Sequence, residues 1–267
     1  MTSNLTIQVS KNGERTILKN CFFNPPYKIA DITEDKKKGT LHLMLMSSSP
    51  GVLDNDSYDI NIEVEADCDL QMHTQSYQRI FTMKQQASQK TTVTMGINSS
   101  VCFIPHPVVP HKDSSFVADT HIFMEENASL VWGEIISCGR KLNGEVFQFQ
   151  KYHSRLSVFY GKRLVLKENL LLEPALVNPT SIGQFQHFTH QATLFFLNDR
   201  FPVETLKKKI SAELAGWQNI SFGITKTAFN GLFLRILGQQ SEQLFDCLKL
   251  LSQQILLTVQ MKTSDTN

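Results

Sequence analysis

The stretch TLHLMLM, residues 40–46, places Leu41, Leu43 and Leu45 at every second position. Successive side chains of an extended chain point to opposite faces, so this period of two predicts a strand with one apolar face. The same alternation returns later, with Ile60, Ile62 and Val64 in YDINIEVEA (58–66) and with Val93, Met95 and Ile97 in TTVTMGI (91–97). The first 200 residues are therefore expected to be rich in strands.

Further segments of the same kind follow, separated by turn sequences. The expected strands include SSFVADTHIFM (114–124), SLVWGEIIS (129–137), EVFQFQ (145–150), SRLSVFY (154–160) and ATLFFLN (192–198). The turns are KNGE (11–14), SPGVLDND (49–56), GRKLNGE (139–145) and EPALVNP (173–179). Many short strands with short turns favour a mainly β fold of stacked, β-helical strands over a βαβ fold. No residue-level repeat is visible in the sequence.

The C-terminal quarter changes to a helical period. In PVETLKKKISAELAGW, Pro202 suits the first turn of a helix whose apolar face carries Val203, Leu206, Ile210, Leu214 and Trp217. A second helix is predicted after a cap at Ser241, with an inward face of Leu244, Leu248, Leu251 and Ile255. No linker divides the chain, so we expect a single domain over 1–267, β-rich over 1–200 and α+β with about two helices over 201–267.

Composition limits the class of protein. Hydrophobic residues make up 41% and charged residues 19%, as in folded domains, and a net charge of +1 argues against a nucleic-acid or membrane surface. No apolar run approaches the ~20 residues that span a bilayer, and the N-terminus lacks a signal-peptide core, so a cytoplasmic protein is expected. The five cysteines lie far apart and never form a CxxC pair, which predicts buried reduced thiols.

The sequence lacks the motifs of common enzymes, such as GxSxG, a P-loop or HExxH. Its closest histidine pairs are His106 and His111 in FIPHPVVPHKD, and His187 and His190 in FQHFTH. The prolines between His106 and His111 exclude a helix, and positions five apart on a strand face opposite sides. We therefore expect a proline-stiffened loop with solvated imidazoles rather than a two-histidine metal site. A turn would be needed for His187 and His190 to share a metal.

Three acids occupy informative positions. Glu134 lies within the apolar LVWGEIISCG, Glu168 lies within LVLKENLLL, and Asp56 ends the turn SPGVLDND. A carboxylate inside an apolar strand is either on a solvated face or buried with a partner, because burial alone costs several kcal/mol or leaves the group protonated. The spacing leaves both arrangements open, including an internal polar path.

Taken in order, several segments resemble one family, the urease accessory protein UreD, called UreH in some bacteria. The segments are NCFFNPPYKI (20–29), SPGVLDND (49–56), HTQSYQRIF (73–81), FIPHPVVPHKDSSF (103–116), WGEIISCGRKLNGEVFQF (132–149) and VLKENLLLEP (165–174). The segment 132–149 is the most specific, because an acid, apolar residues, Gly-Arg and then Gly-Glu-x-Phe follow one another. The C-terminal helices fit in outline only, and histidine is not part of the family pattern at 103–116.

The resemblance implies a scaffold without catalysis of its own. By this resemblance the chain is expected to form a complex with UreF and, through it, with the GTPase UreG, to dock on apo-urease, and to help deliver nickel. A water-filled passage through the protein is the nickel route that the resemblance implies. A dimer of such complexes is one possible assembly, and transient Ni²⁺ takes the place of a tightly bound cofactor. Carried over by position, Asp56, Glu134 and Glu168 match acids linked to the passage, and Glu145 is a weaker candidate.

The chain departs from the family pattern at three places. Asp54-Asn55 replaces a glycine-rich turn, and both residue types tolerate left-handed backbone angles. Gln78 stands in place of a small hydroxyl residue, and Gly133 stands where an aromatic residue is common.

Two other functions remain open on the residues alone. One is an intracellular β-rich scaffold unrelated to urease. The other is a metal-dependent hydrolase that uses His106, His111 or His187 with a nearby acid.

Overall fold

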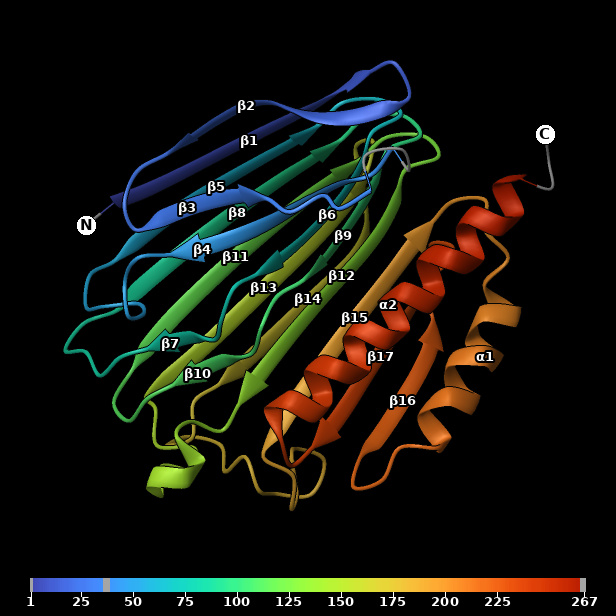
Figure 1. The fold of residues 1–267 in the computed structure, drawn as a ribbon. Coiled ribbons are helices and arrows are strands. Elements are labelled where there is room, and N and C mark those ends of the chain that lie inside the picture. The colour runs from blue at the N-terminus through green and yellow to red at the C-terminus, as the bar shows by residue number, and fades with distance from the viewer. Residues whose placement is uncertain (1, 36–38, 265–267) are drawn as a thin grey trace.

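The computed structural model describes residues 2–35 and 39–264, and it consists of two facing β-sheets with two α-helices beside them (Figure 1). Sheet A has the strand order β14 (Arg163–Leu172), β13 (Lys151–Tyr160), β11 (Ser115–Met124), β8 (Ala87–Met95), β5 (Ser57–Val64), β1 (Thr2–Asn12) and β2 (Arg15–Phe23). Sheet B has the order β16 (Ser221–Lys226), β17 (Gly231–Gly238), β15 (His190–Asn198), β12 (Ser129–Ser137), β9 (Ser100–Ile104), β6 (Asp69–Thr74), β4 (Leu41–Ser47) and β3 (Tyr27–Asp31).

Two short strands extend sheet B, since β10 (Val108–Pro110) pairs with both β7 (Gln78–Ile80) and β12. Between β4 and β13 the chain alternates between the sheets, and consecutive strands within each sheet pair in parallel. Antiparallel strands flank this coil, such as β2 on β1 and β14 on β13. The predicted mainly β fold of stacked strands is therefore confirmed.

Asparagine and aspartate side chains stack at the turns that lead from sheet A to sheet B. Asp67, Asn98 and Asn127 have φ angles of 59°, 57° and 58°, the left-handed region that these residue types tolerate. The Asn98 amide donates to Asp67 Oδ1 at 2.9 Å, and the Asn127 amide donates to Asn98 Oδ1 at 3.0 Å. Each turn of the coil therefore repeats a single Asn or Asp residue. One shared residue per turn is too little to be visible as a sequence repeat.

The apolar face of each alternating strand packs between the sheets. Leu41, Leu43, Ile60, Ile62, Val64, Val93 and Met95 are buried in one core cluster, and Leu45 packs against it. Ile97 was expected on the same face, but it lies beyond the end of β8 and is 48% exposed. Burial of these side chains is the main force that holds the two sheets together.

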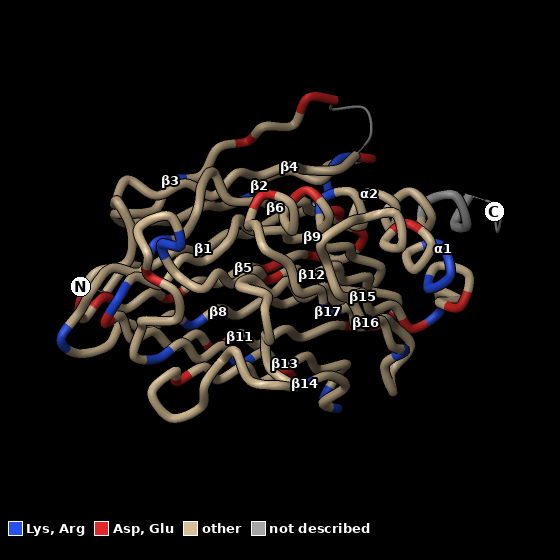
Figure 2. The backbone as a smooth tube through the Cα atoms, turned by 90° about the horizontal axis from the view of Figure 1, so that it is seen from below, with Lys and Arg blue, Asp and Glu red and all other residues tan. Residues whose placement is uncertain are grey.

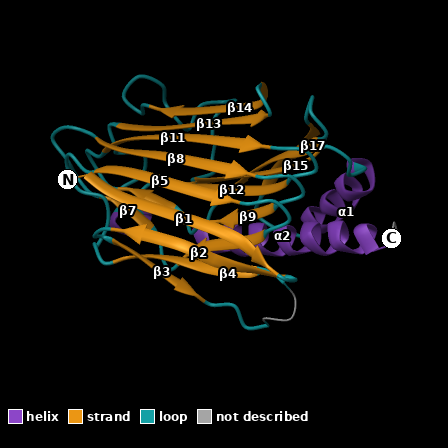
Figure 3. Ribbon diagram, turned by 90° about the horizontal axis from the view of Figure 1, so that it is seen from above, coloured by secondary structure: helices purple, strands orange, loops and turns teal. Residues whose placement is uncertain are grey.

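Both predicted helices lie on the outer face of sheet B (Figure 3). Helix α1 (Val203–Ala215) has Pro202 at its N-cap and buries Val203, Leu206, Ile210 and Leu214, with Trp217 packed against the same cluster. Helix α2 (Ser241–Ser264) starts at Ser241 and buries Leu244, Leu248, Leu251 and Ile255. In the described part of the chain, no helix is long and apolar enough to cross a membrane.

Gly133 on β12 allows α2 to lie close to sheet B. A Cβ atom at this position would lie 3.0 Å from Cδ1 of Ile104 and 3.1 Å from Cδ1 of Leu248. The side chain of position 133 points toward the helix layer, so an aromatic residue here would require α2 to move outward.

Two local predictions were wrong. EVFQFQ (145–150) forms no strand, because the chain turns through Gly139 and the 3₁₀ helix η2 (Lys141–Asn143) and then buries Phe147 and Phe149. The proline segment is not simply a loop either, since Val108–Pro110 forms β10. The cysteine prediction is confirmed: all five thiols are free, four are buried, and Cys21 is half-buried.

Charged residues of both signs are spread along the described backbone (Figure 2). This distribution agrees with the net charge of +1.

Candidate functional site

A cavity with about 200 Å³ of room for water centres lies between the two sheets. One water needs roughly 10–15 Å³ by this measure, so several waters fit. The lining residues Ser47, Gln75 and Ser76 are exposed and mark the opening. Deeper in, the wall alternates between apolar side chains and polar ones, the latter including Thr74, Gln78, Gln89, Thr91, Thr120, Ser154 and Glu134.

Glu134 lies at the inner part of this cavity. Its neighbours at even positions on β12, Leu130, Trp132 and Ile136, belong to the core between the sheets, so the strand period turns Glu134 inward as well. The Ser154 hydroxyl on the facing sheet donates to Glu134 Oε2 at 3.1 Å. Glu134 is half-buried, and the part of its side chain that stays accessible faces the cavity.

Burial raises the pKa of Glu134 from 4.5 to about 7. The Ser154 hydroxyl and the Trp132 indole N–H act in the opposite direction, and the negative charge of Glu168 raises the pKa further. The indole nitrogen is itself buried and does not reach full hydrogen-bond geometry. Near neutral pH, Glu134 is therefore present in both its protonated and its ionised form.

A second, smaller void continues from Glu134. It has about 10 Å³ of room for water centres, close to the space of a single water, and Glu134, Tyr152, Leu170, Gln191 and Thr193 contribute to its wall. Glu134, Ile135 and Tyr152 line both spaces, so the glutamate stands where they meet.

Glu168 lies next to the second void rather than in the wall of the large cavity. It is on β14, two positions from Leu170 and therefore on the same strand face. Nη2 of Arg235 on β17 donates to Glu168 Oε1, and the two side chains are 40% and 18% exposed, respectively. Sequence reasoning picked out Glu168 and missed its partner Arg235, although GLFLRIL shows the same signal of one charge in an apolar strand.

Asp56 contributes to the cavity through a neighbour. Asn55 has a φ of 64°, as expected for the substituted turn. The Asp56 Oδ2 atom accepts hydrogen bonds of 2.8 Å from the Leu53 backbone N–H and from the Tyr58 hydroxyl. Tyr58 lines the cavity and Asp56 does not, so the acid holds a wall residue in place.

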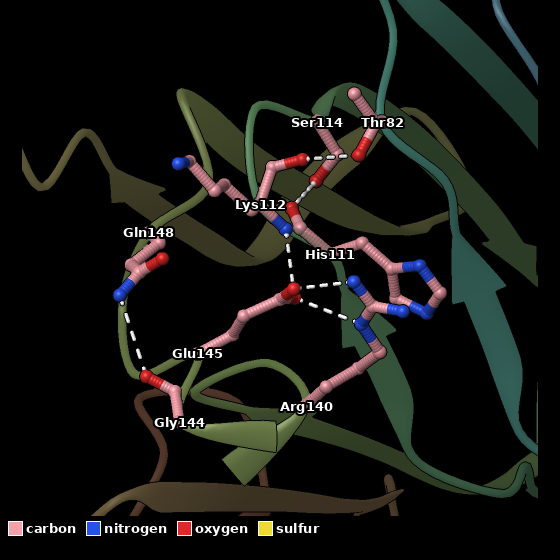
Figure 4. A network of polar contacts seen from close by, with 8 residues as sticks. All are labelled: Thr82, His111, Lys112, Ser114, Arg140, Gly144, Glu145 and Gln148. Atoms are coloured by element: carbon pink, nitrogen blue, oxygen red, sulfur yellow. Dashed lines mark hydrogen bonds and ion pairs between the residues drawn. The ribbon is translucent and has the colours of Figure 1, made fainter.

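Glu145 lies away from the cavity, in a network of surface contacts (Figure 4). Its carboxylate accepts hydrogen bonds from Nε and Nη2 of Arg140 and from the Lys112 backbone N–H, at 2.9 Å for Nε and 3.2 Å for Lys112. The hydrogen bond from Arg140 is the main reason why the pKa of Glu145 is lowered. These contacts tie the loop after β12 to the segment that follows β10.

His106 and His111 do not converge on one site. His111 is buried and meets the Phe81 ring edge-on at 4.7 Å, so the expectation of a solvated imidazole is wrong for this residue. His106 is half-buried, lines the cavity and stacks on Phe245 at 4.1 Å. Burial lowers the pKa of both histidines.

His187 and His190 also differ in environment. His187 is exposed beside Phe188, whereas His190 is buried, which lowers its pKa to about 4. Over residues 2–35 and 39–259, no group of three His, Cys, Asp or Glu side chains is placed to hold a metal ion. The site is a cavity whose oxygen donors are scattered along its wall.

Comparison with known proteins finds relatives that match most of the chain. The family described as UreD urease accessory protein matches residues 1–264. A urease accessory protein UreD from Flavobacterium johnsoniae is 44% identical over 250 residues, which cover 93% of this chain and 90% of that protein. A UreD from Acetivibrio thermocellus is 35% identical over 250 residues, covering 93% and 95%.

The family match and the relatives define the class as an accessory protein for urease rather than an enzyme. The chain belongs to the UreD family. Membership in this family argues against the two alternatives that the sequence left open, the metal-dependent hydrolase and the scaffold unrelated to urease.

Proposed function

We propose that this chain is a scaffold for nickel delivery, in which Ni²⁺ travels between the two sheets on its way to apo-urease. The observation that carries the proposal is the cavity that opens at Ser47 and Gln75 and reaches the half-buried Glu134. The small void beyond Glu134 extends this space toward Glu168.

The chemistry of the wall suits an ion that must leave again. A conduit needs several weak sites, because an ion that is held tightly at one place does not move on. Ni²⁺ stands high in the affinity order of divalent metals, so a cage of thiolates and imidazoles would retain it. Hydroxyl, amide and single carboxylate oxygens, as in Ser154, Gln89 and Glu134, bind it more weakly.

Binding of a cation at Glu134 is coupled to the release of a proton. With a pKa of about 7, it gives up a proton when a cation binds and takes one back when the cation departs. Glu134 is therefore the central site of the proposed passage, Glu168 is the next acid along it, and Asp56 acts through Tyr58. Glu145 does not line the cavity, and its carboxylate accepts a hydrogen bond from Arg140. Its place on the nickel route stays a prediction.

The partners proposed for this role are UreF, the GTPase UreG and apo-urease, within the cytoplasm. The support is family membership together with the cavity between the sheets, which opens at Ser47 and Gln75. We also propose that two copies of such a complex form a dimer.

A tagged pull-down of the full chain from urease-expressing cells, with bound proteins identified by mass, tests the assembly. Urease subunits, UreF and UreG are expected to co-elute. In the same cells, Glu134→Gln is expected to lower the nickel content of urease while the same partners still co-elute. Glu126→Gln is the matched control, because Glu126 is an exposed acid whose side chain pairs with Arg200 on the surface. Normal nickel content with Glu134→Gln would refute the route.

A further inference from the structure

The Glu168–Arg235 pair connects the two sheets at one side of the molecule. Glu168 belongs to β14, the edge strand of sheet A, and Arg235 belongs to β17 of sheet B. Nη2 of Arg235 donates directly to Oε1 of Glu168. The pair therefore spans the gap between the sheets, as Ser154 and Glu134 do further inside.

Strand register links this pair to the cavity. Glu134 is paired with Thr193 on β15, and Thr193 is paired with Arg235 on β17, so the three residues form one row across sheet B. Thr193 lines the small void next to Glu134, and Leu170 brings β14 into the same wall. The Glu168–Arg235 pair is thus the next polar element after that void.

In this arrangement the Glu168 carboxylate is already paired with the positively charged Arg235 side chain. A guanidinium group keeps its charge at every physiological pH and donates in a fixed planar geometry, so it does not yield its place by losing a proton. A divalent cation that comes from the side of Glu134 meets a positive charge. The guanidinium charge opposes binding of that cation to the Glu168 carboxylate, so the cation binds more tightly once Arg235 moves away.

Arg235 has somewhere to move. Its side chain is 40% exposed, so the guanidinium group can turn toward solvent when it leaves Glu168. In the paired arrangement its Cζ already lies 5.2 Å from the centroid of the Phe233 ring. Its Nε–H is buried without a hydrogen-bond acceptor among the described residues, which weakens the paired arrangement. The ion pair between Arg235 and Glu168 can therefore open by a movement of the Arg235 side chain.

We propose that Arg235 and an incoming divalent cation compete for the Glu168 carboxylate, so that Arg235 closes this end of the passage until the cation displaces it. The inference rests on the proposed function, because it gives Arg235 a role in regulating the same passage. Its central claim, competition at Glu168, is measured without urease.

The test is Ni²⁺ binding to the full-length chain, with any proteins that co-purify, by equilibrium dialysis. Arg235→Gln is expected to bind Ni²⁺ about tenfold more tightly than the parent at one added site, since a charge-assisted hydrogen bond no longer competes. The double variant Arg235→Gln/Glu168→Gln is expected to lose this gain. An unchanged affinity in Arg235→Gln, or a gain that survives Glu168→Gln, would overturn the proposal.

Arg155→Gln is the matched control, because Arg155 pairs with Asp119 on the outer face of sheet A at a similar exposure. It is expected to leave Ni²⁺ binding unchanged. If Arg235→Gln does not fold, Arg235→Lys replaces it, since Lys keeps the charge but loses the planar fork. It must show a smaller gain that also depends on Glu168, and no gain would refute competition. Failure of the nickel route itself would instead appear as normal urease nickel content with Glu134→Gln.

Discussion

Ser154 on β13 donates a hydrogen bond to Glu134 on β12 across the gap between the sheets, with 3.1 Å between Oγ and Oε2. This bond joins two residues that no strand pairing brings together, since β13 belongs to sheet A and β12 to sheet B. It fixes the carboxylate at the meeting point of the large cavity and the small void. The contact lowers the pKa of Glu134, although burial outweighs it.

Removal of this hydrogen bond is expected to change proton binding by Glu134. In Ser154→Ala, the ionised carboxylate loses a donor, so the pKa of Glu134 should rise above its present value of about 7. Delivery of nickel at neutral pH should fall, and it should recover at higher pH, where the carboxylate is ionised again. The measurement is urease nickel content against pH, with Ser157→Ala on the same strand as the control. A fall of equal size at every pH would point to a structural defect instead.

The stability of the protein is expected to depend on pH through Glu134. The folded-state pKa of about 7 lies above the ordinary 4.5, so the folded state binds this proton more tightly than the unfolded state. The contribution is fully present below pH 4.5 and is lost as the pH rises through 7, by up to about 3 kcal/mol.

Glu134→Gln removes that dependence, because glutamine cannot ionise. The Tm of the variant minus the Tm of the parent is therefore expected to increase between pH 5 and pH 8, by roughly 5–10 °C. Thermal unfolding at the two pH values measures it. The comparison with the variant cancels the contributions of His111 and His190, whose lowered pKa values act in the opposite sense. An identical difference at both pH values would mean that Glu134 is solvated.

Periodicity predicted which side chains face inward, but not which strands pair. The faces of Leu41, Ile60 and Val93 follow from alternation alone, because burial and a period of two are local properties. Pairings such as Glu134 with Thr193 depend on a strand about 60 residues away, and nothing local encodes that register.

The candidate site was predictable to a similar extent. A single charge in an apolar strand located Glu134 and Glu168, and the same signal would have found Arg235. The burial of His111 could not be foreseen, since it depends on Phe81 from another turn of the coil. The surface position of Glu145 follows from the contact with Arg140, which a sequence does not show.

Gly133 is expected to be required for the packing of α2. Gly133→Ala places a Cβ 3.0 Å from Ile104 and 3.1 Å from Leu248, which should cost about 1–3 kcal/mol as the helix shifts. Gly223→Ala on β16 is the matched control, because a Cβ there has nothing within 4 Å and the backbone angle is ordinary. Thermal unfolding should show a lower Tm for the first variant alone. Equal Tm values would show that α2 adjusts freely.

The stacked turns give a last prediction, which separates hydrogen bonding from backbone strain. Asn98 donates to Asp67 and accepts from Asn127, and its φ of 57° suits Asn and Gly better than Ala. Asn98→Gly removes both side-chain hydrogen bonds but keeps the backbone relaxed, whereas Asn98→Ala removes the bonds and adds strain.

Loss of the side-chain hydrogen bonds should lower the free energy of unfolding by about 1 kcal/mol, because the side chain is exposed and water replaces part of the bonding. The backbone strain of alanine should lower it by about 1 kcal/mol more. The expected order of Tm is therefore parent, then Asn98→Gly, then Asn98→Ala, as measured by thermal unfolding. If the glycine variant equals the parent, the stacked amides contribute nothing and the turns need only the left-handed angle. If the two variants are equal, backbone strain is negligible and the hydrogen bonds account for the whole preference for asparagine.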